Sequence, residues 1–208
     1  MFGIINSLVI YMEVVRQRPL VIAGPSGVGK SFLAQQLLAR SEIFKMLLST
    51  TTRPQRSAEV DGVDMRFVSQ ERYAQIQAAQ DFFMDNPFFG HLYGYERPLI
   101  EGVLNHGNIP VALVYAPVVD QFVQAYPEST TLFLNPGDVG LLRERMEKRG
   151  DAPASIEGRM AGIEKEMAAF EKDRALYQEV VEVHGNAATD EALARIATRY
   201  NLSNLLRA

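Results

Sequence analysis

The sequence predicts an α/β fold with a parallel sheet and crossover helices, and three observations lead to this prediction. Short apolar runs alternate with helical patterns along most of the chain, which is typical of parallel strands joined by helices. A glycine-rich segment separates the first apolar run from the first helix. The length of 208 residues suits one domain with a small insert or lid, and 47% hydrophobic content is ample for its core.

The elements of the core follow in chain order. Residues 20–23 (LVIA) are a short continuous apolar run, which predicts a buried strand, and residues 31–40 (SFLAQQLLAR) predict a helix. Three later strands are expected at residues 111–116, 130–135 and 179–183. Each of these is followed by a helical pattern, as crossover connections require.

The pattern changes between Leu47 and about Gly107. Short strand-like pieces at residues 65–69 and 81–89 lie on either side of a helix that Ser69 can cap. We therefore predict an inserted subdomain. The expected division is an N-terminal extension at 1–17, a core formed by 18–46 and 108–208, and the insert at 47–107.

Charge and composition narrow the possible functions. A net charge of −4 gives no broad basic field for nucleic acid or a membrane surface, so any anion has to be held locally. Without cysteine there is no thiolate metal site or cysteine nucleophile, and three histidines make a zinc site improbable. Residues 1–11 lack the features of an export signal or a membrane span. We expect a cytoplasmic protein, and the sequence leaves open whether the extension is an extra strand, a packed segment or precedes a true start at Met12.

The strongest motif is GPSGVGKS, which directly follows the first strand and opens the first helix. It fits the P-loop pattern, in which backbone N–H groups and the helix N-terminus bind phosphate. Lys30 is expected to reach the β- and γ-phosphates of ATP, and the Ser31 hydroxyl to face Mg²⁺. The predicted ATP-binding residues are Gly24, Pro25, Ser26, Gly27, Val28, Gly29, Lys30 and Ser31.

A second basic group, Arg145, Arg149 and Arg159, lies around a segment with the composition of a mobile lid, at about residues 149–159. Phosphoryl transfer develops negative charge on the transferred group, so we predict that these arginines and Lys30 act in catalysis. The other interpretation is a solvated helix face with a Glu144–Lys148 pair. Downstream, an apolar stripe predicts core packing at Ile156, Met160, Ile163, Met167 and Phe170.

Arg53 and Arg56 stand three apart in STTTRPQRSAEVDGVDM, a stretch of hydroxyls and turn formers. Two forked guanidiniums can bind phosphate oxygens in bidentate fashion, so they suggest a second anion beside the one at the P-loop. The alternative is that both arginines only hold a surface loop in place.

These motifs, with FGHLYG and LLRERMEKRG in the same order, resemble the guanylate kinase family from about Arg18 to Tyr200. The resemblance implies a P-loop core, a nucleoside-monophosphate-binding insert and an arginine lid, with Mg²⁺ bound alongside ATP. It also implies that the acceptor phosphate is held by Arg53, Arg56 and Tyr93, with Ser49 retained nearby. His91 and His106 receive no catalytic role, because phosphoryl transfer rests mainly on positioning and charge.

The sequence departs from this family where guanine is recognised. Met84 stands at the position of the glutamate that reads the guanine edge, Met65 at that of a tyrosine and Tyr95 at that of a serine. Leu113 and Tyr115 replace paired strand acids. We predict that Met65, Met84 and Tyr95 contribute to an apolar or aromatic-lined acceptor pocket, unless a bulge turns Asp85 inward to read the base. The alternative is that each methionine only packs the core of the small subdomain.

The predicted function is ATP-dependent phosphoryl transfer to GMP or a related phosphorylated small molecule. Two alternatives stay open: an enzyme similar to ribose bisphosphate kinases, and a non-catalytic binding module of guanylate-kinase type. The expected partners are ATP and the acceptor, with no nucleic acid and no membrane. The sequence does not indicate an oligomeric state.

Overall fold

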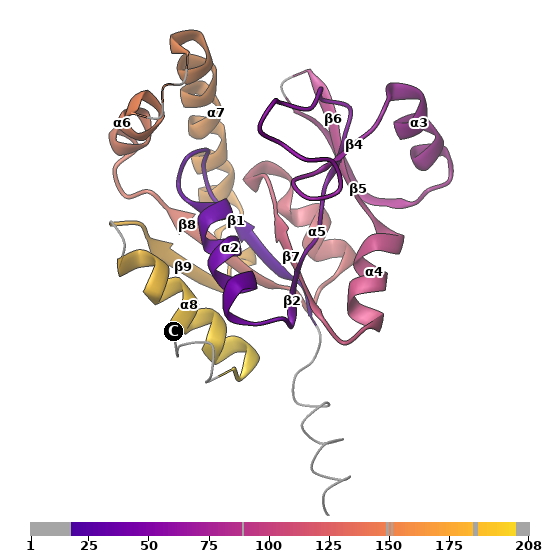
Figure 1. Ribbon diagram of the computed structural model, residues 1–208. Coiled ribbons are helices and arrows are strands. Elements are labelled where there is room, and N and C mark those ends of the chain that lie inside the picture. The colour runs from indigo at the N-terminus through magenta and orange to yellow at the C-terminus, as the bar shows by residue number, and fades with distance from the viewer. Residues whose placement is uncertain (1–17, 89, 149, 151, 185–186, 203–208) are drawn as a thin grey trace, which may run out of the picture.

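The computed structural model describes residues 18–88, 90–148, 150, 152–184 and 187–202. Within these residues the central sheet has five strands in the order β2-β7-β1-β8-β9, and every neighbouring pair is parallel, as predicted. Figure 1 shows this sheet with its helices beside a separate lobe that carries β4 to β6. The five strands are β1 (Leu20–Ala23), β2 (Phe44–Met46), β7 (Ile109–Leu113), β8 (Thr130–Asn135) and β9 (Glu179–Glu182).

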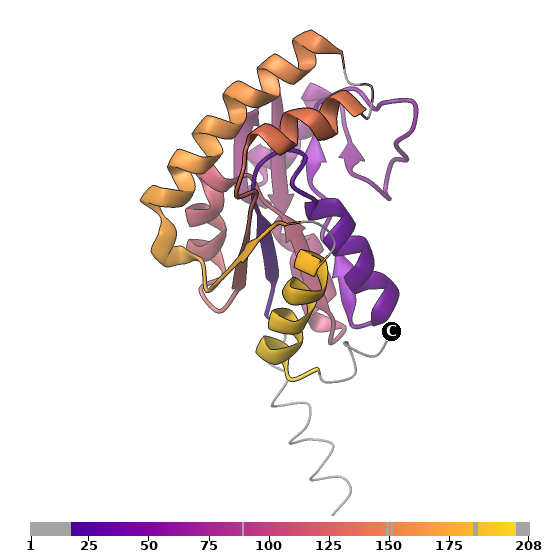
Figure 2. The same cartoon turned by 90° about the vertical axis from the view of Figure 1, so that its left-hand side faces the viewer.

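Helices cover both faces of this sheet, because successive side chains of a strand point to opposite faces. Leu20 and Ile22 of β1 enter one hydrophobic cluster, and Val21 and Ala23 enter another. Figure 2 shows α2 and α8 on one side of the sheet and α7 on the other. The helices around the sheet are α2 (Lys30–Arg40), α4 (Arg97–Asn105), α5 (Val119–Ala125), α6 (Gly140–Lys148), α7 (Pro153–Lys172) and α8 (Ala187–Tyr200). None of the helices in the described part of the chain has the length and apolar character needed to cross a membrane.

A second sheet, in the order β4-β3-β6-β5, builds the other lobe. Its strands are β3 (Thr50–Thr51), β4 (Arg66–Phe67), β5 (Phe82–Phe88) and β6 (His91–Glu96). Ser69 caps α3 (Gln70–Ala78), since its hydroxyl accepts a hydrogen bond from the Arg72 backbone N–H at 3.2 Å. These elements fall inside the stretch predicted as an insert, and the domain limits themselves stay a prediction.

The strand predicted at residues 111–116 is displaced. β7 begins at Ile109 and ends at Leu113, and Ala116–Val118 form the short 3₁₀ helix η1. The Val114 N–H still donates to the Ile22 carbonyl oxygen at 3.1 Å, and the chain enters η1 two residues later. Tyr115 therefore lies just beyond the carboxyl edge of the sheet, which is where open α/β sheets bind their ligands.

Candidate active site

The P-loop runs from the end of β1 into α2, and its first glycine is required by close packing. Gly24 has φ of +142°, and a Cβ at this position would lie 2.6 Å from the Leu134 carbonyl oxygen. Only glycine tolerates both the backbone conformation and the contact. The loop is thereby held against β8, with its backbone free to curl around a phosphate.

The Lys30 side chain folds back onto this loop. Its Nζ donates hydrogen bonds to the carbonyl oxygens of Gly24, at 2.5 Å, and Pro25, at 3.1 Å. Burial lowers the pKa of Lys30, and the nearby negative charge of Glu166 opposes that shift. The P-loop carbonyl groups therefore position the ammonium group, which is expected to bind the β- and γ-phosphates of ATP.

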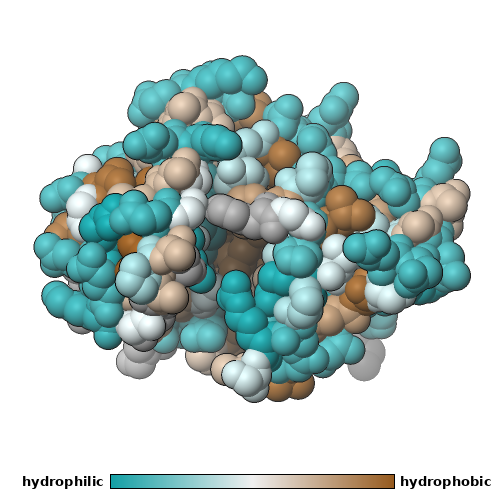
Figure 3. Space-filling model, turned by 90° about the horizontal axis from the view of Figure 1, so that it is seen from above, coloured by the Kyte–Doolittle hydropathy of each residue, from teal (hydrophilic) through white to brown (hydrophobic). Residues whose placement is uncertain are grey.

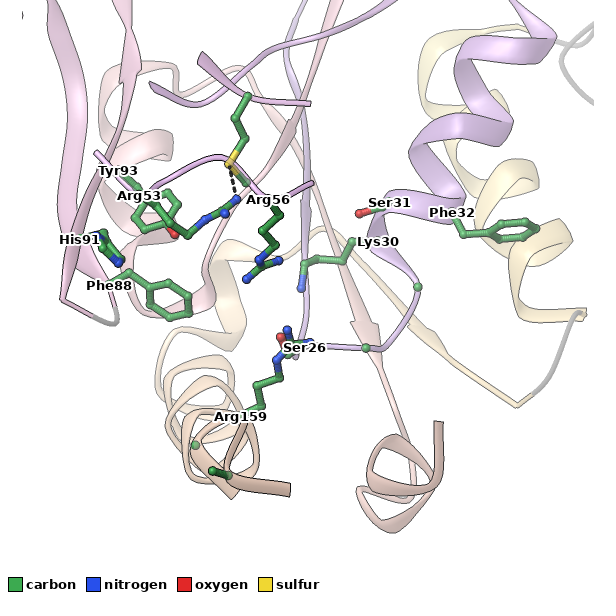
Figure 4. A pocket seen from close by; sticks show the side chains of 15 residues that line it. Ser26, Lys30, Ser31, Phe32, Arg53, Arg56, Phe88, His91, Tyr93 and Arg159 are labelled. Carbon is green, nitrogen blue, oxygen red and sulfur yellow. Dashed lines mark hydrogen bonds between the residues drawn. The ribbon is translucent and has the colours of Figure 1, made fainter. Parts of the chain in front are cut away.

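A cavity of about 790 Å³ extends from the P-loop to the second lobe. Figure 3 looks down on this side of the molecule, which is hollowed near its middle. In Figure 4, the side chains of Lys30, Arg56 and Arg159 point toward one space from the P-loop, the second lobe and α7. Among the described residues, no carboxylate lines the cavity: the lining is Ser26, Gly27, Gly29, Lys30, Ser31, Phe32, Arg53, Arg56, Met65, Phe88, His91, Tyr93, Ala154, Gly158 and Arg159. Such a lining suits ligands with several phosphate charges.

The two arginines of the second lobe differ in their surroundings. Arg53 is 11% exposed, and its Nη2 lies 2.8 Å from Glu59 Oε1. Arg56 is 62% exposed and lies 3.7 Å from the same carboxylate. The hydrogen bond from Arg53 is the main reason that the pKa of Glu59 is lowered. Arg53 therefore holds its loop as well as facing the cavity, whereas Arg56 presents an open guanidinium.

The lid arginines are only partly described. Arg159 lies on α7 and lines the cavity. Arg149 and the side chain of Arg145 lie outside the described residues, so their predicted roles stay predictions. The Glu144–Lys148 pair considered above is present at 3.8 Å and is exposed. A closer pair, with 2.6 Å between Arg143 Nη1 and Glu157 Oε1, joins α6 to α7.

Comparisons with known proteins agree with this arrangement. The family model described as Guanylate kinase matches residues 16–198. A guanylate kinase of Thermus thermophilus is 35% identical over 150 residues, covering 72% of this chain and 67% of that protein. One from Thermosynechococcus vestitus is 36% identical over 143 residues, covering 68% and 75%. The chain belongs to the guanylate kinase family.

A solved structure supports the fold of this family member. The crystal structure of guanylate kinase from Anaplasma phagocytophilum superposes with a TM-score of 0.69 at 22% identity, covering 91% of this chain and 87% of that one. The predicted P-loop α/β fold and the assignment as a kinase of nucleoside-monophosphate-kinase type are thereby confirmed.

The acceptor side of this guanylate kinase family member departs from our expectation. Met84 and Tyr95 pair across β5 and β6 and are only 5% and 4% exposed, within the hydrophobic core. The Tyr95 hydroxyl donates to the Leu113 carbonyl oxygen at 2.8 Å. Neither residue is among those lining the cavity, because the inward face of the sheet at this point packs onto the central core. Ser49 is also absent from the lining, and its carbonyl oxygen accepts the Arg66 N–H at 3.0 Å.

Asp85 does not replace the missing glutamate in this structure. A bulge does occur in β5, between Phe82 and Met84. It leaves Asp85 on the opposite face from Met84, where its Oδ2 accepts a hydrogen bond from Gln77 Nε2 at 2.9 Å. The polar group on the inward face is the next residue, Asn86, which pairs with Tyr93.

Aromatic side chains surround the part of the cavity that is formed by β5 and β6. Phe88 and His91 pair across the hairpin and both line the cavity, although no catalytic role was predicted for His91. The Phe88 ring lies 4.5 Å from that of Tyr115 and 5.8 Å from that of Tyr93. Tyr115, at the position of a family acid, therefore provides an aromatic contact between the two lobes.

Sequence reasoning missed two carboxylates. Glu59 was hidden in a loop in which only the arginines were considered. Glu166 is buried in α7 beside Lys30. Its signal is visible in retrospect, since it is an acid three residues after Ile163 and four before Phe170, within the apolar stripe.

Proposed function

We propose that this protein transfers the γ-phosphoryl group of ATP to the phosphate of a nucleoside monophosphate, GMP or a close relative. One observation carries the proposal: the P-loop lysine and the arginines of the second lobe face a single cavity whose described lining has cations but no carboxylate. Two phosphorylated ligands bound at its two ends would bring their phosphates together. We also propose that the protein is cytoplasmic, because the proposed activity and a chain without cysteine both agree with that location.

The residues divide between donor and acceptor. The P-loop backbone and Lys30 hold the β- and γ-phosphates of ATP, and Arg56, Arg53 and Tyr93 hold the acceptor phosphate. An acceptor phosphate oxygen forms a bond to the γ-phosphorus while the bond from that phosphorus to the β–γ bridging oxygen breaks, releasing ADP. Arg159, with Arg145 and Arg149 as further candidates, stabilises the charge on the transferred group.

The residues present fit a magnesium ion bound with ATP. Ser31 is the second residue of α2 and lines the cavity, which suits a P-loop hydroxyl ligand. Mg²⁺ commonly keeps several waters and uses substrate phosphates as ligands, so few protein groups are required. When bound, the ion neutralises charge on the β- and γ-phosphates. No group of three or more histidine, aspartate or glutamate side chains in the described part of the chain forms another metal site.

For the acceptor, we propose that a phosphate is required but that guanine is weakly preferred. Met84 is buried, Asp85 bonds to Gln77, and Phe88, His91 and Tyr93 line the cavity. Rings stack on any base, whereas a carboxylate selects guanine through its N–H groups. Losing two hydrogen bonds to a charged group, each worth about 1.5–3 kcal/mol, lowers selectivity by roughly a hundredfold to ten-thousandfold.

The test is an ADP-release assay with ATP, Mg²⁺ and a panel of GMP, dGMP, AMP, CMP, UMP, IMP, ribose phosphates and guanosine. We expect turnover of several monophosphates and none of guanosine. Arg56→Ala should raise the acceptor KM roughly tenfold or more, and Lys30→Ala should abolish ATP binding. A strong preference for GMP over AMP would refute only the proposal that guanine is weakly preferred, and the kinase proposal would stand. ATP binding without turnover of any acceptor would refute the kinase proposal and favour a binding module.

A further inference from the structure

Glu166 is a buried carboxylate that the mechanism above does not use. It is 4% exposed, on α7, and it lies where this helix packs against η1. Glu96, the other buried acid among the described residues, is paired with the Thr50 hydroxyl and the Arg66 guanidinium. Glu166 instead faces backbone groups of Ser26, in the P-loop, and of Ala116, in η1, which favour its charged form.

The carboxylate also acts on Lys30. Burial raises the pKa of Glu166 to about 7, and the charge of Lys30 and the nearby backbone groups of Ser26 and Ala116 oppose that shift. Burying a carboxylate is costly unless its charge is compensated, and the side chains that face it include Tyr115 and Tyr177 besides Lys30. The compensation therefore comes from the P-loop and its lysine.

Glu166 lies near the end of β7, where this chain lacks the acid that many P-loop enzymes carry. P-loop enzymes commonly place an acid beyond the end of a neighbouring strand, where it acts near the phosphates. Here β7 is followed by Val114 and Tyr115, and none of the described residues that line the cavity is an acid. Glu166 reaches the same edge from α7, since its backbone partner Ala116 directly follows Tyr115.

The geometry of α7 connects this carboxylate to the lid. Arg159 and Glu166 are seven residues apart in one continuous helix, so they lie about two turns apart on one face. Arg159 lines the cavity, and the buried carboxylate of Glu166 faces the P-loop.

We propose that Glu166 is a positioning residue for phosphoryl transfer: it holds the P-loop and the Lys30 ammonium, and it sets the position of α7 that brings Arg159 to the cavity. This inference rests on the proposed function. It predicts that the carboxylate contributes to the rate and not to nucleotide binding or stability.

The test compares Glu166→Gln with Glu164→Gln, an exposed acid on the same helix. We expect Glu166→Gln to lower kcat roughly 10- to 100-fold, with the ATP dissociation constant within about threefold and Tm unchanged or higher. Glu166→Asp should recover part of kcat. Glu164→Gln should leave all three quantities unchanged. Wild-type kcat in Glu166→Gln, or a loss of kcat explained by a smaller folded fraction, would overturn the proposal.

A second readout does not depend on turnover. In ligand-free protein with isotope-labelled lysine, the Lys30 NMR signal, assigned with Lys30→Arg, should shift in Glu166→Gln and not in Glu164→Gln. Absence of that shift would contradict the electrostatic interaction between Glu166 and Lys30. If wild type phosphorylates no acceptor while the shift is present, the proposed function fails and the structural relation stands.

Discussion

Met84 and Asn86 lie on the same face of β5, two residues apart, and have different surroundings. Met84 is buried beside Tyr95, whereas Asn86 is partly exposed beside Tyr93 of the cavity. A carboxylate at position 84 would have no described cation beside it in this apolar core. We expect Met84→Glu to lower the free energy of unfolding by about 3 kcal/mol or more, roughly 6–12 °C in Tm.

Asn86→Glu is the matched control, because it places the same group closer to the cavity. Its Tm should stay within about 2 °C of wild type, since the side chain can reach solvent. Thermal unfolding of both variants measures the difference. A Met84→Glu protein as stable as wild type would show that the side chain can leave the core toward the acceptor site, as the family's glutamate implies.

For single residues, the sequence predicted which residues are functional better than it predicted the contacts that they make. GPSGVGKS was recognisable because its chemistry is local to one loop. The difference between Arg53 and Arg56 depends on Glu59, and the burial of Met84 depends on packing against the distant core. Such contacts follow from the three-dimensional structure, which residue spacing alone does not contain.

Among the elements, α6 and α7 carry arginines with two different roles. Arg159 lines the cavity, whereas Arg143 pairs with Glu157 at the surface. We expect Arg159→Ala to lower kcat roughly 100-fold with little change in the KM for ATP, because the charge that it stabilises develops in the transition state. Steady-state kinetics with saturating acceptor measures both constants.

Arg143→Ala is the control for loss of a guanidinium near the lid. An exposed ion pair contributes at most about 1 kcal/mol, so this variant should keep the kcat of wild type. A change confined to KM in Arg159→Ala would instead assign the residue to ground-state binding of ATP.

Elements with a strong apolar period were predicted well. β1 and β8 have the predicted limits, and the predicted α2 differs by one residue. β2, of three residues, and β3, of two, were missed, because so short a strand shows no alternation. Strand β7 begins two residues earlier than predicted and ends at Leu113, because the apolar run continues into η1 and apolar spacing alone does not separate the two.

For the whole molecule, the cavity concentrates cations in a protein of net charge −4. Phosphorylated ligands should therefore stabilise the folded state by mass action, by about 2.7 kcal/mol at a hundred times the dissociation constant. We expect ATP with Mg²⁺, and the acceptor alone, each to raise Tm by roughly 5–10 °C in thermal scans.

Variants can assign each stabilising effect to its site. Lys30→Ala should remove the shift caused by ATP and keep the shift caused by the acceptor, and Arg56→Ala should do the reverse. Loss of both shifts in either variant would mean that the two ligands do not occupy separate ends of the cavity.

The continuity of α7 has a consequence for how this chain can change in length. A residue deleted between Arg159 and Glu166 would rotate one side chain by about 100° relative to the other and shorten their separation by about 1.5 Å. Point substitutions at exposed positions of this interval, such as Ala161 and Glu164, keep this geometry, whereas insertions and deletions do not unless they add or remove whole turns. Length variation is therefore expected before Pro153, in the connection from α6, where no helical phase has to be kept.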